Sequence, residues 1–185
     1  LNKNISIDSR TASKDVFAGD PYPYESPDTT HFSVMDQYGN AVSNTYTLNF
    51  SYGSGIMIPG TGMLMNNEMD DFSSKPGVPN GYGLLGSEAN SIEANKRPLS
   101  SMTPTIIFKD NKPYLVLGSP GGSRIITTVL QVALNVMEHD MNVAQAVNSP
   151  RIHHQWLPEV LMMEKGFGPD TEKLLQEKGY KLYTS

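Results

Sequence analysis

Two adjacent threonines, Thr29 and Thr30, stand where a proline-rich segment ends and a strand-like segment begins. A threonine at the start of a chain is a complete nucleophile, because its hydroxyl attacks while its own free α-amine serves as the base. That amine has a reference pKa of about 7.7–8, which suits a general base near neutral pH. Cleavage of the bond between Asp28 and Thr29 would create such a residue. Taken alone, however, a threonine pair more often marks an ordinary strand start.

The residues after Thr29 predict a β-hairpin that returns the chain to this threonine. A Gly-Asn turn separates an alternating segment at residues 30–36 from a second one, rich in β-branched and aromatic residues, at residues 41–49. Because the strands of a hairpin run antiparallel, Thr47 and Asn49 should come back toward Thr29. Side chains repeat every second residue along a strand, so the two should share one face.

A second signal is the pair Gly121 and Gly122, immediately before a predicted helix at residues 123–139. Residues without Cβ let backbone N–H groups approach a ligand, and the start of a helix favours negative charge. The pair can therefore stabilise the oxyanion of an acyl transfer. A tight strand-to-helix turn explains it too. A phosphate loop is disfavoured, because the Gly-Lys-Ser/Thr signature is missing.

Three carboxylates and two hydroxyls complete the candidate chemistry. Glu68, Asp70 and Asp71 can bind a cation, but no nearby histidine completes a metal-ligand set, so a metal is disfavoured. An ammonium group or a plain solvated acidic loop remains. Ser100 and Ser101 stand before a predicted strand, where they either bind a ligand or form a turn.

The histidines are interpreted as structural. His153 and His154 are adjacent, so on a strand they point to opposite faces and cannot chelate one ion together. His31 is nearest the candidate nucleophile, but it faces away from Thr30 and is expected to pack.

The remaining pattern predicts an α+β protein, because paired strands are followed by helices and then by more strands. Residues 50–98 have weak periodicity and many Gly, Asn and Pro residues, which predicts a long functional or irregular loop. The helix at residues 123–139 is apolar almost all round, which predicts burial on two sides. Further elements are expected as strands at 103–109, 113–118, 151–154, 160–164 and 180–183, and as helices at 143–148 and 169–178.

The bulk composition excludes several classes of protein. The chain has 185 residues, enough for one domain, a net charge of −5 and no cluster of Lys and Arg, so nucleic acid is not an expected partner. With no Cys, thiol catalysis, disulfides and Cys-based zinc sites are excluded. No apolar run reaches the ~20 residues of a membrane span, and no signal peptide is visible. The chain begins and ends as if cut from something longer.

Taken together, these segments resemble the small subunit of γ-glutamyltranspeptidase (glutathione hydrolase), a family of N-terminal-nucleophile hydrolases. The resemblance runs from about residue 25 to the end of the chain. Five motifs recur in the family's order, which is far more specific than any single motif. They lie at residues 29–34, 45–49, 66–72, 95–102 and 118–124.

The resemblance implies a role for each reacting group. Thr29 looks like the nucleophile and the self-cleavage site, after Asp28. Thr47 would hydrogen-bond Thr29 and help to activate it. Gly121 and Gly122 would form the oxyanion hole.

The resemblance also implies how a substrate is held. The α-amino group of a γ-glutamyl substrate would be bound by Asn49, Glu68 and Asp71, and two carboxylates suit one ammonium group. Ser100 and Ser101 would bind its α-carboxylate. Residues 76–87, with Tyr82, look like the lid loop of many bacterial members.

The implied fold is a four-layer αββα sandwich, incomplete in this chain. Residues 1–28 would be the tail of the large subunit of the same precursor, and residues 29–185 a small-subunit catalytic domain that is truncated at its C-terminal end. The large subunit would supply an Arg for the α-carboxylate. As written, Thr29 is internal, so the sequence describes the uncut form.

The implied substrates are glutathione or other γ-glutamyl compounds, with water or amino acids as acceptors and no cofactor. Family members of this kind from bacteria are periplasmic or secreted. Two alternatives stay open: a cephalosporin acylase or poly-γ-glutamate transpeptidase of the same superfamily, and a non-catalytic fragment kept for binding.

Overall fold

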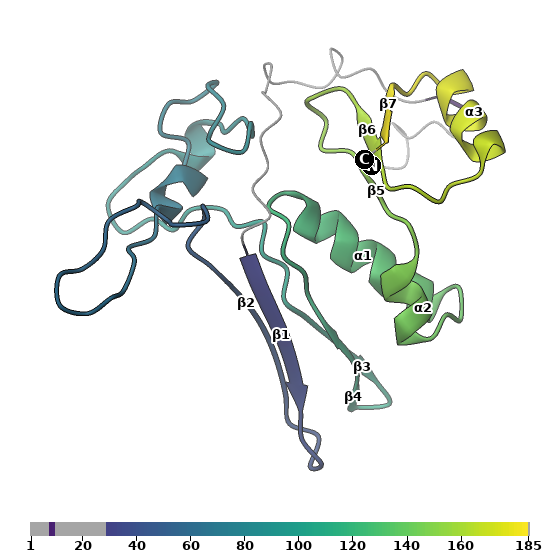
Figure 1. Ribbon diagram of the computed structural model, residues 1–185, viewed down its shortest axis with the longest axis horizontal. Helices are drawn as coiled ribbons and strands as arrows, with labels where there is room; N and C mark the ends of the chain where they lie inside the picture. The colour runs from purple at the N-terminus through teal and green to yellow at the C-terminus, as the bar shows by residue number, and fades with distance from the viewer. Residues whose placement is uncertain (1–7, 10–28, 185) are drawn as a thin grey trace.

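The computed structural model describes residues 8–9 and 29–184. The predicted large-subunit tail at residues 1–28, and with it Asp28, therefore lies outside the described residues apart from residues 8 and 9. Strands and helices alternate along the chain in an α+β order (Figure 1). In sequence they are β1 (Thr29–Met35), β2 (Ala41–Thr47), the 3-10 helices η3 (Glu68–Asp71) and η4 (Glu88–Asn90), β3 (Thr105–Lys109), β4 (Lys112–Leu117), α1 (Arg124–Met137), α2 (Val143–Asn148), β5 (Ile152–His153), β6 (Leu161–Met163), α3 (Pro169–Glu177) and β7 (Leu182–Thr184).

The predicted hairpin at the start of the described chain is confirmed. β1 and β2 pair antiparallel over their whole length, from Thr29 opposite Thr47 to Met35 opposite Ala41. The turn is fixed by Asp36, whose Oδ1 accepts from the backbone N–H of Tyr38 at 2.8 Å. The second strand is shorter than expected, because β2 ends at Thr47 and the chain leaves the extended conformation before Asn49.

A second hairpin carries the main core. β3 and β4 pair antiparallel around Asp110 and Asn111, whose positive φ angles of 51° and 59° match a tight two-residue turn. Helix α1 packs against this hairpin and against α2. The buried cluster is formed by Leu115, Leu117, Ile125, Val129, Val132, Ala133 and Ala146.

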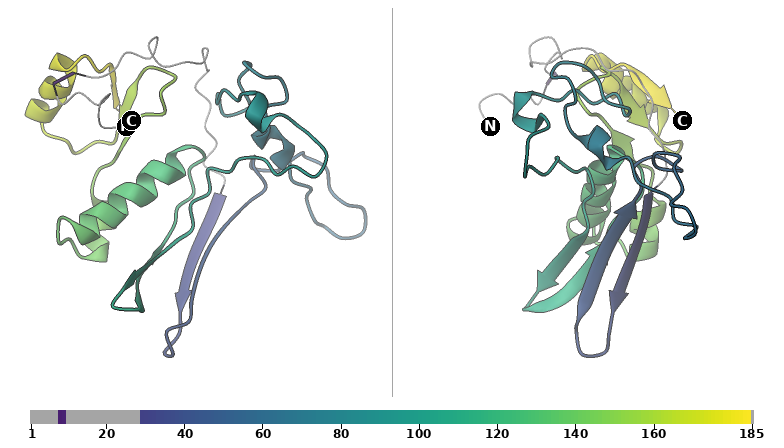
Figure 2. Two further views of the ribbon diagram at one scale, coloured as in Figure 1. Left: turned by 180° about the vertical axis from the view of Figure 1, so that it is seen from behind. Right: turned by 90° about the vertical axis from the view of Figure 1, so that its left-hand side faces the viewer.

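The two hairpins lie side by side and extend in the same direction, away from the start of β1 (Figures 1 and 2). The Ser43 hydroxyl on β2 donates to the carbonyl of Leu117 on β4 at 2.9 Å. At the end of β4, Gly118 approaches His31 so closely that an added Cβ would lie 2.2 Å from Nδ1 of the imidazole. His31 is thus a packing residue on β1, as the sequence indicated.

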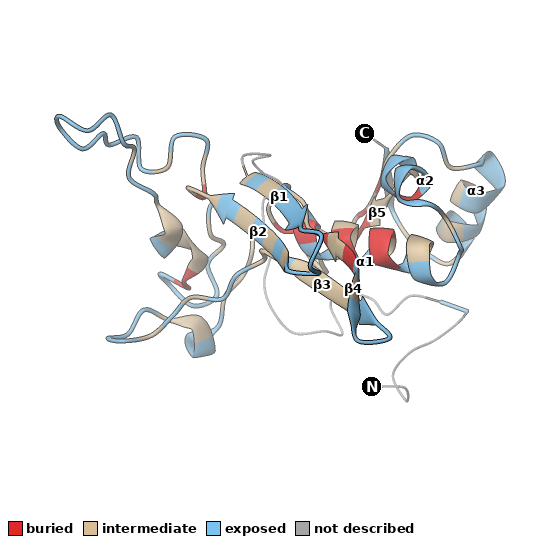
Figure 3. Ribbon diagram, turned by 90° about the horizontal axis from the view of Figure 1, so that it is seen from below, coloured by how far each residue is buried: buried red, intermediate tan, exposed pale blue. Residues whose placement is uncertain are grey.

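Helix α1 is buried on one side only, so the expectation of burial on two sides is wrong for the described chain. Ile125 and Val129 are buried, whereas Ile126 and Leu130 are 49% and 54% exposed. Figure 3 shows buried and less buried positions along the same helix. Apolar periodicity shows that a helix face is suited to burial, but not whether a partner covers that face.

The C-terminal elements match the predicted order. A capping box starts α2, because the Asn142 side chain accepts from the backbone of Gln145 while the Gln145 side chain accepts from the backbone of Asn142. β6 then pairs antiparallel with β5 and parallel with β7. No helix in the described part of the chain has the length and apolarity needed to cross a bilayer.

The long segment between β2 and β3 is irregular, as the sequence predicted. It forms a lobe on one side of the hairpins, with η3 and η4 inside it (Figure 1). Amide side chains replace a regular ladder here: Asn80 accepts from the backbone N–H of Leu84 at 2.9 Å, and Asn90 donates to the carbonyl of Asp71 at 2.7 Å. The segment is therefore held by specific side-chain contacts.

Candidate active site

One pocket gathers nearly all of the candidate residues, although they come from segments far apart in the sequence. It lies at the start of β1, where the hairpin, the irregular lobe and the start of α1 meet. Its lining includes Thr29, Thr47, Asn49, Glu68, Asp71, Tyr82, Ser100, Ser101 and Gly122. Gly121 is the exception, since it lines a neighbouring pocket together with Gly118.

Thr29 and Thr47 face each other across the hairpin. They are partners in the antiparallel register, and both are partly buried. The Thr47 hydroxyl accepts a hydrogen bond of 2.9 Å from the backbone N–H of Asn49. This bond orients the Thr47 side chain at the point where β2 ends.

Asn49 joins the hairpin to the lobe. Its φ of 75° lies in the left-handed region, and only 4% of the residue is exposed. Its side chain donates to the carbonyl of Asn67 at 3.2 Å, and its own carbonyl accepts a hydrogen bond from the Tyr82 hydroxyl. Asn49 reaches the pocket through this turn and not through the strand alternation that the sequence suggested.

Tyr82 is an anchored residue of the predicted lid. It is 7% exposed, and its ring meets the ring of Phe50 at a centroid distance of 5.5 Å and an angle of 60°. The turn before it is held by Asp70, whose carboxylate accepts from the backbone N–H of Gly81 at 3.0 Å. The loop therefore places its tyrosine in the wall of the pocket.

Glu68 and Asp71, on η3, form an acidic pair. Burial, and then the neighbouring charge of Asp71, raise the pKa of Glu68 to about 7. Burial, and then the charge of Asp70, also raise the pKa of Asp71. Among the described residues, the buried Oε1 atom of Glu68 has no hydrogen-bond partner. Such a pair favours a bound cation that compensates the buried charge. No group of three His, Asp or Glu side chains in the described chain is arranged to hold a metal ion.

Ser100 and Ser101 lie before β3, not on it. The Ser100 hydroxyl accepts from the backbone N–H of Met102 at 3.2 Å. The carbonyl of Ser101 accepts from the Thr103 hydroxyl at 2.9 Å, which leaves the Ser101 side chain at the pocket wall.

The glycine pair forms the turn that starts α1. Gly121 and Gly122 have φ angles of 130° and 56°, which side chains rarely tolerate. Their carbonyls accept from Arg124 N–H at 3.0 Å and from Ile125 N–H at 3.2 Å. In a trans peptide the N–H points opposite to the C=O. The N–H groups of Gly122 and Ser123 therefore point off the N-terminal end of the helix.

Sequence reasoning missed four further pocket residues, which are Leu84, Met102, Ser123 and Ile125. Three are apolar and carry no chemical signal of their own in a sequence. Ser123 directly follows the glycine pair, and its position there could have drawn attention to it.

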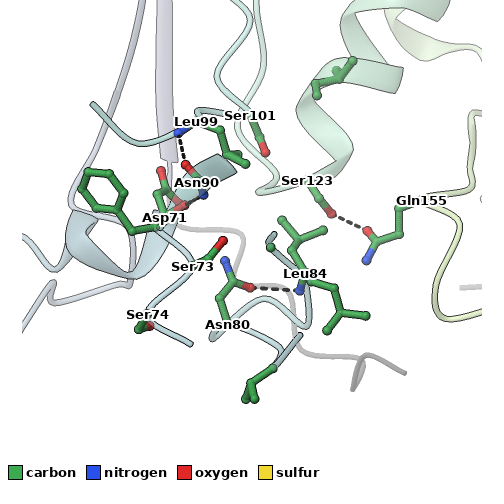
Figure 4. Close-up of a pocket in the computed structure, with 15 residues that line it drawn as sticks. Asp71, Ser73, Ser74, Asn80, Leu84, Asn90, Leu99, Ser101, Ser123 and Gln155 are labelled. Carbon is green, nitrogen blue, oxygen red and sulfur yellow. Dashed lines mark hydrogen bonds between the residues drawn. The ribbon is translucent and has the colours of Figure 1, made fainter. Parts of the chain in front are cut away.

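A second, wider pocket continues from the first (Figure 4). The two share Asp71, Leu84, Ser101 and Ser123, so they lie on either side of these side chains. The wider pocket runs between the lobe and Gln155, which lies in the connection after β5.

These observations define an α+β protein in which a threonine at the start of a strand lines a pocket. Two carboxylates, two serine hydroxyls and the N-terminal end of a helix line the same pocket. The model of the γ-glutamyltranspeptidase family matches residues 1–185, and the chain belongs to that family. It is 59% identical over 178 residues to the glutathione hydrolase proenzyme of Escherichia coli (strain K12), covering 96% of this chain and 31% of that protein. The chain thus spans about a third of the length of this curated relative.

Solved structures give the same relationship. A γ-glutamyltranspeptidase from Helicobacter pylori matches with a TM-score of 0.82 and 62% identity over 84% of each chain. A cephalosporin acylase from Bacillus halodurans matches with a TM-score of 0.71 and 25% identity, over 84% of this chain and 27% of that one. The fold extends to both, while the sequence is much closer to the first.

Proposed function

We propose that this chain is the catalytic part of a γ-glutamyl hydrolase and transferase that acts on glutathione and related γ-glutamyl compounds. The supporting observation is the single pocket that contains Thr29, the acidic pair and the serine pair. One end of a γ-glutamyl group carries an ammonium and a carboxylate on the same carbon. Glu68 and Asp71 suit the ammonium, while Ser100 and Ser101 donate hydrogen bonds to the carboxylate.

Maturation comes first in this proposal. The Thr29 hydroxyl attacks the carbonyl carbon of Asp28, and the C–N bond to Thr29 breaks as the nitrogen takes the hydroxyl proton. The chain then stays joined through an ester between the Asp28 carbonyl and Oγ1 of Thr29. Water then cleaves the ester and releases a free α-amine on Thr29. Residues 1–28 become the tail of a large subunit, and residues from Thr29 onward become the small subunit of a heterodimer.

Turnover uses the groups created by that cut. The Thr29 amine takes the proton of its own hydroxyl as the oxygen attacks the γ-carbonyl carbon. The oxyanion is stabilised by the N–H groups of Gly122 and Ser123, which the turn at Gly121 and Gly122 points off the positive end of the α1 dipole. The leaving amine takes the proton, and water or an amino acid later releases the γ-glutamyl group from its ester. Thr47 holds the Thr29 side chain.

The wider setting follows from the same proposal. The complete protein has the four-layer αββα arrangement of N-terminal-nucleophile hydrolases, the large subunit contributes to carboxylate binding, and the enzyme works in the periplasm or outside the cell. No cofactor takes part. The higher identity to γ-glutamyltranspeptidases favours this function over a cephalosporin acylase.

The test uses the full-length precursor that contains this chain. The wild type should yield two bands on a denaturing gel, and the smaller should begin with Thr29. Thr29→Ala should give one uncut band and no activity. Thr30→Ala is the matched control, since Thr30 is the exposed neighbour, and it should cut normally. Release of aniline from a γ-glutamyl anilide should far exceed release from the glutaryl analogue. A single uncut band in the wild type, or preference for the glutaryl compound, would contradict the proposal.

A further inference from the structure

A series of side-chain hydrogen bonds links the glycine turn at the start of α1 to the segment at the end of β5. Ser123 is the N-cap residue of α1, a position where serine usually accepts from a backbone N–H of the first turn. Here the side chain makes no such bond. Its hydroxyl donates instead to Oε1 of Gln155, in the connection after β5 (Figure 4).

Gln155 and His153 continue the chain. Nε2 of Gln155 donates to the carbonyl of Leu157 at 3.1 Å, which fixes the amide orientation and makes Oε1 the acceptor. His153 lies 2.9 Å from that same Oε1 through Nε2, so this nitrogen carries a proton. Its Nδ1 lies 2.8 Å from the hydroxyl of Thr127, back on the first turn of α1.

The series of hydrogen bonds is partly buried and closes on itself. Ser123 and His153 are each 7% exposed, so water competes little for their bonds. The path runs from Ser123 through Gln155 and His153 to Thr127, whose hydroxyl also lies 3.0 Å from the carbonyl oxygen of Arg124. Both ends therefore lie on the start of α1, and the middle lies on the β5 segment.

We propose that Ser123, Gln155 and His153 are positioning residues that hold the peptide between Gly122 and Ser123 in the orientation needed to stabilise the oxyanion. A turn of two glycines has little stiffness of its own. The side chain of Ser123 is the first after the glycine pair that can fasten it, and the hydrogen bond to Gln155 does so from outside the helix. This role rests on the proposed acyl transfer.

The chain offers a matched control for this inference. Gln131 also joins α1 to β5, since its amide donates to the carbonyls of Thr127 and Ile152, each at 2.8 Å, and accepts from the N–H of Ile152 at 2.9 Å. It lies two turns further along the helix. Gln131→Leu therefore loses at least as many hydrogen bonds between the same elements without touching the glycine turn.

The test measures kcat and KM on the cleaved fraction of the precursor for Ser123→Ala, Gln155→Leu, the double variant and Gln131→Leu. An oxyanion donor acts in the transition state. Ser123→Ala and Gln155→Leu should therefore each lower kcat about 10- to 100-fold with little change in KM. The double variant should lose no more than the single variants, because both break one chain. Gln131→Leu should lower Tm and keep kcat. Wild-type kcat in Gln155→Leu, or an equal kcat loss in Gln131→Leu, would overturn the inference.

A second measurement does not depend on activity. Hydrogen exchange of the amides at residues 122–125 should be faster in Ser123→Ala and Gln155→Leu than in the wild type, and unchanged in Gln131→Leu. If exchange is faster in the two variants but the wild type hydrolyses no γ-glutamyl substrate, the proposed function is refuted. The inference that Ser123 and Gln155 hold the glycine turn would then still stand. Unchanged exchange in Gln155→Leu would refute the fastening itself.

Discussion

Thr29 is the antiparallel partner of Thr47, at the end of a hairpin whose seven residue pairs are all in register. The two side chains therefore share the face that opens into the pocket. Their separation is set by the β-ladder, and the Thr47 hydroxyl is itself oriented by the N–H of Asn49. Both threonines thus line the pocket from facing positions in the ladder.

Thr47→Val should lower kcat about 10- to 100-fold, as expected for the loss of one hydrogen bond of about 1.5–3 kcal/mol to the charged nucleophile. Valine keeps the shape and the β-propensity, so the strand should persist. Thr45→Val is the control, because its hydroxyl contacts Nδ1 of His31 on the same face of the hairpin. That variant should alter stability and leave kcat unchanged. Equal kcat losses in both variants would mean that the hairpin, not the Thr47 hydroxyl, is responsible.

The apparent affinity for a γ-glutamyl substrate should depend on Glu68. Its pKa is raised to about 7, so it takes up a proton as the pH falls through 7 and ceases to attract an ammonium group. KM should therefore rise as the pH falls from 8 to 6. Glu68→Gln should have a high KM at every pH and lose this part of the dependence. An unchanged KM profile in that variant would remove Glu68 from substrate binding.

The same shift affects the stability of the unliganded protein, with a defined sign. The folded-state pKa lies above the ordinary glutamate value of 4.5, so the folded chain binds the proton more tightly than the unfolded chain. The resulting stability is present below about pH 4.5 and is lost as the pH rises through about 7. Relative to Glu68→Gln, the wild type should lose Tm between pH 5 and pH 8. Glu88→Gln, an exposed carboxylate on η4, should follow the wild type.

Tyr82→Phe should loosen the loop over the pocket. The change removes the hydrogen bond to the Asn49 carbonyl inside a buried site and should cost about 1–2 kcal/mol. Limited proteolysis should then cut residues 74–86 faster, and KM should rise more than kcat falls. Tyr38→Phe is the control, since Tyr38 is 81% exposed at the hairpin tip and should behave as the wild type.

Gly121→Ala should reduce kcat about 100-fold or more, by forcing a turn whose φ of 130° suits glycine alone. Gly39→Ala serves as the comparison, because its φ of 87° carries similar strain at the distant hairpin turn. Added Cβ atoms face open space at Gly39 and only ordinary contact at Gly121, so strain dominates in both. Both should lower Tm, but only Gly121→Ala should lower kcat.

The local elements could be predicted because their signals are short-range. The hairpin turn needs only Asp36 and its neighbours, and the helix at residues 143–148 is fixed between its Asn142 cap and Pro150. These signals lie within a few residues of the element they define. The expected bounds of the hairpin strands and of this helix accordingly differ from the observed bounds by no more than two residues at each end.

What the sequence could not show depends on contacts between distant segments. The face of α1 that carries Ile126 and Leu130 is apolar whether or not another segment covers it. The sequence therefore predicts burial of this face, and the described chain does not provide it. Asn49 reaches the pocket by a left-handed turn secured through Tyr82, thirty-three residues away. The hydrogen bond from Ser123 to Gln155 likewise has no signature in either local sequence. The roles carried over by the family resemblance remain predictions.

The full-length ladder of the first hairpin has a consequence for how such a precursor is switched on. Thr29 is already paired in β1 while its peptide bond to Asp28 is intact. Cutting that bond would change the connectivity of the chain and leave the threonine where the ladder holds it. Activation would then require no conformational change in β1, and its rate would be set by the cleavage reaction alone. In the proposed scheme, the enzyme would be assembled before it is active, and a single cut would make it competent.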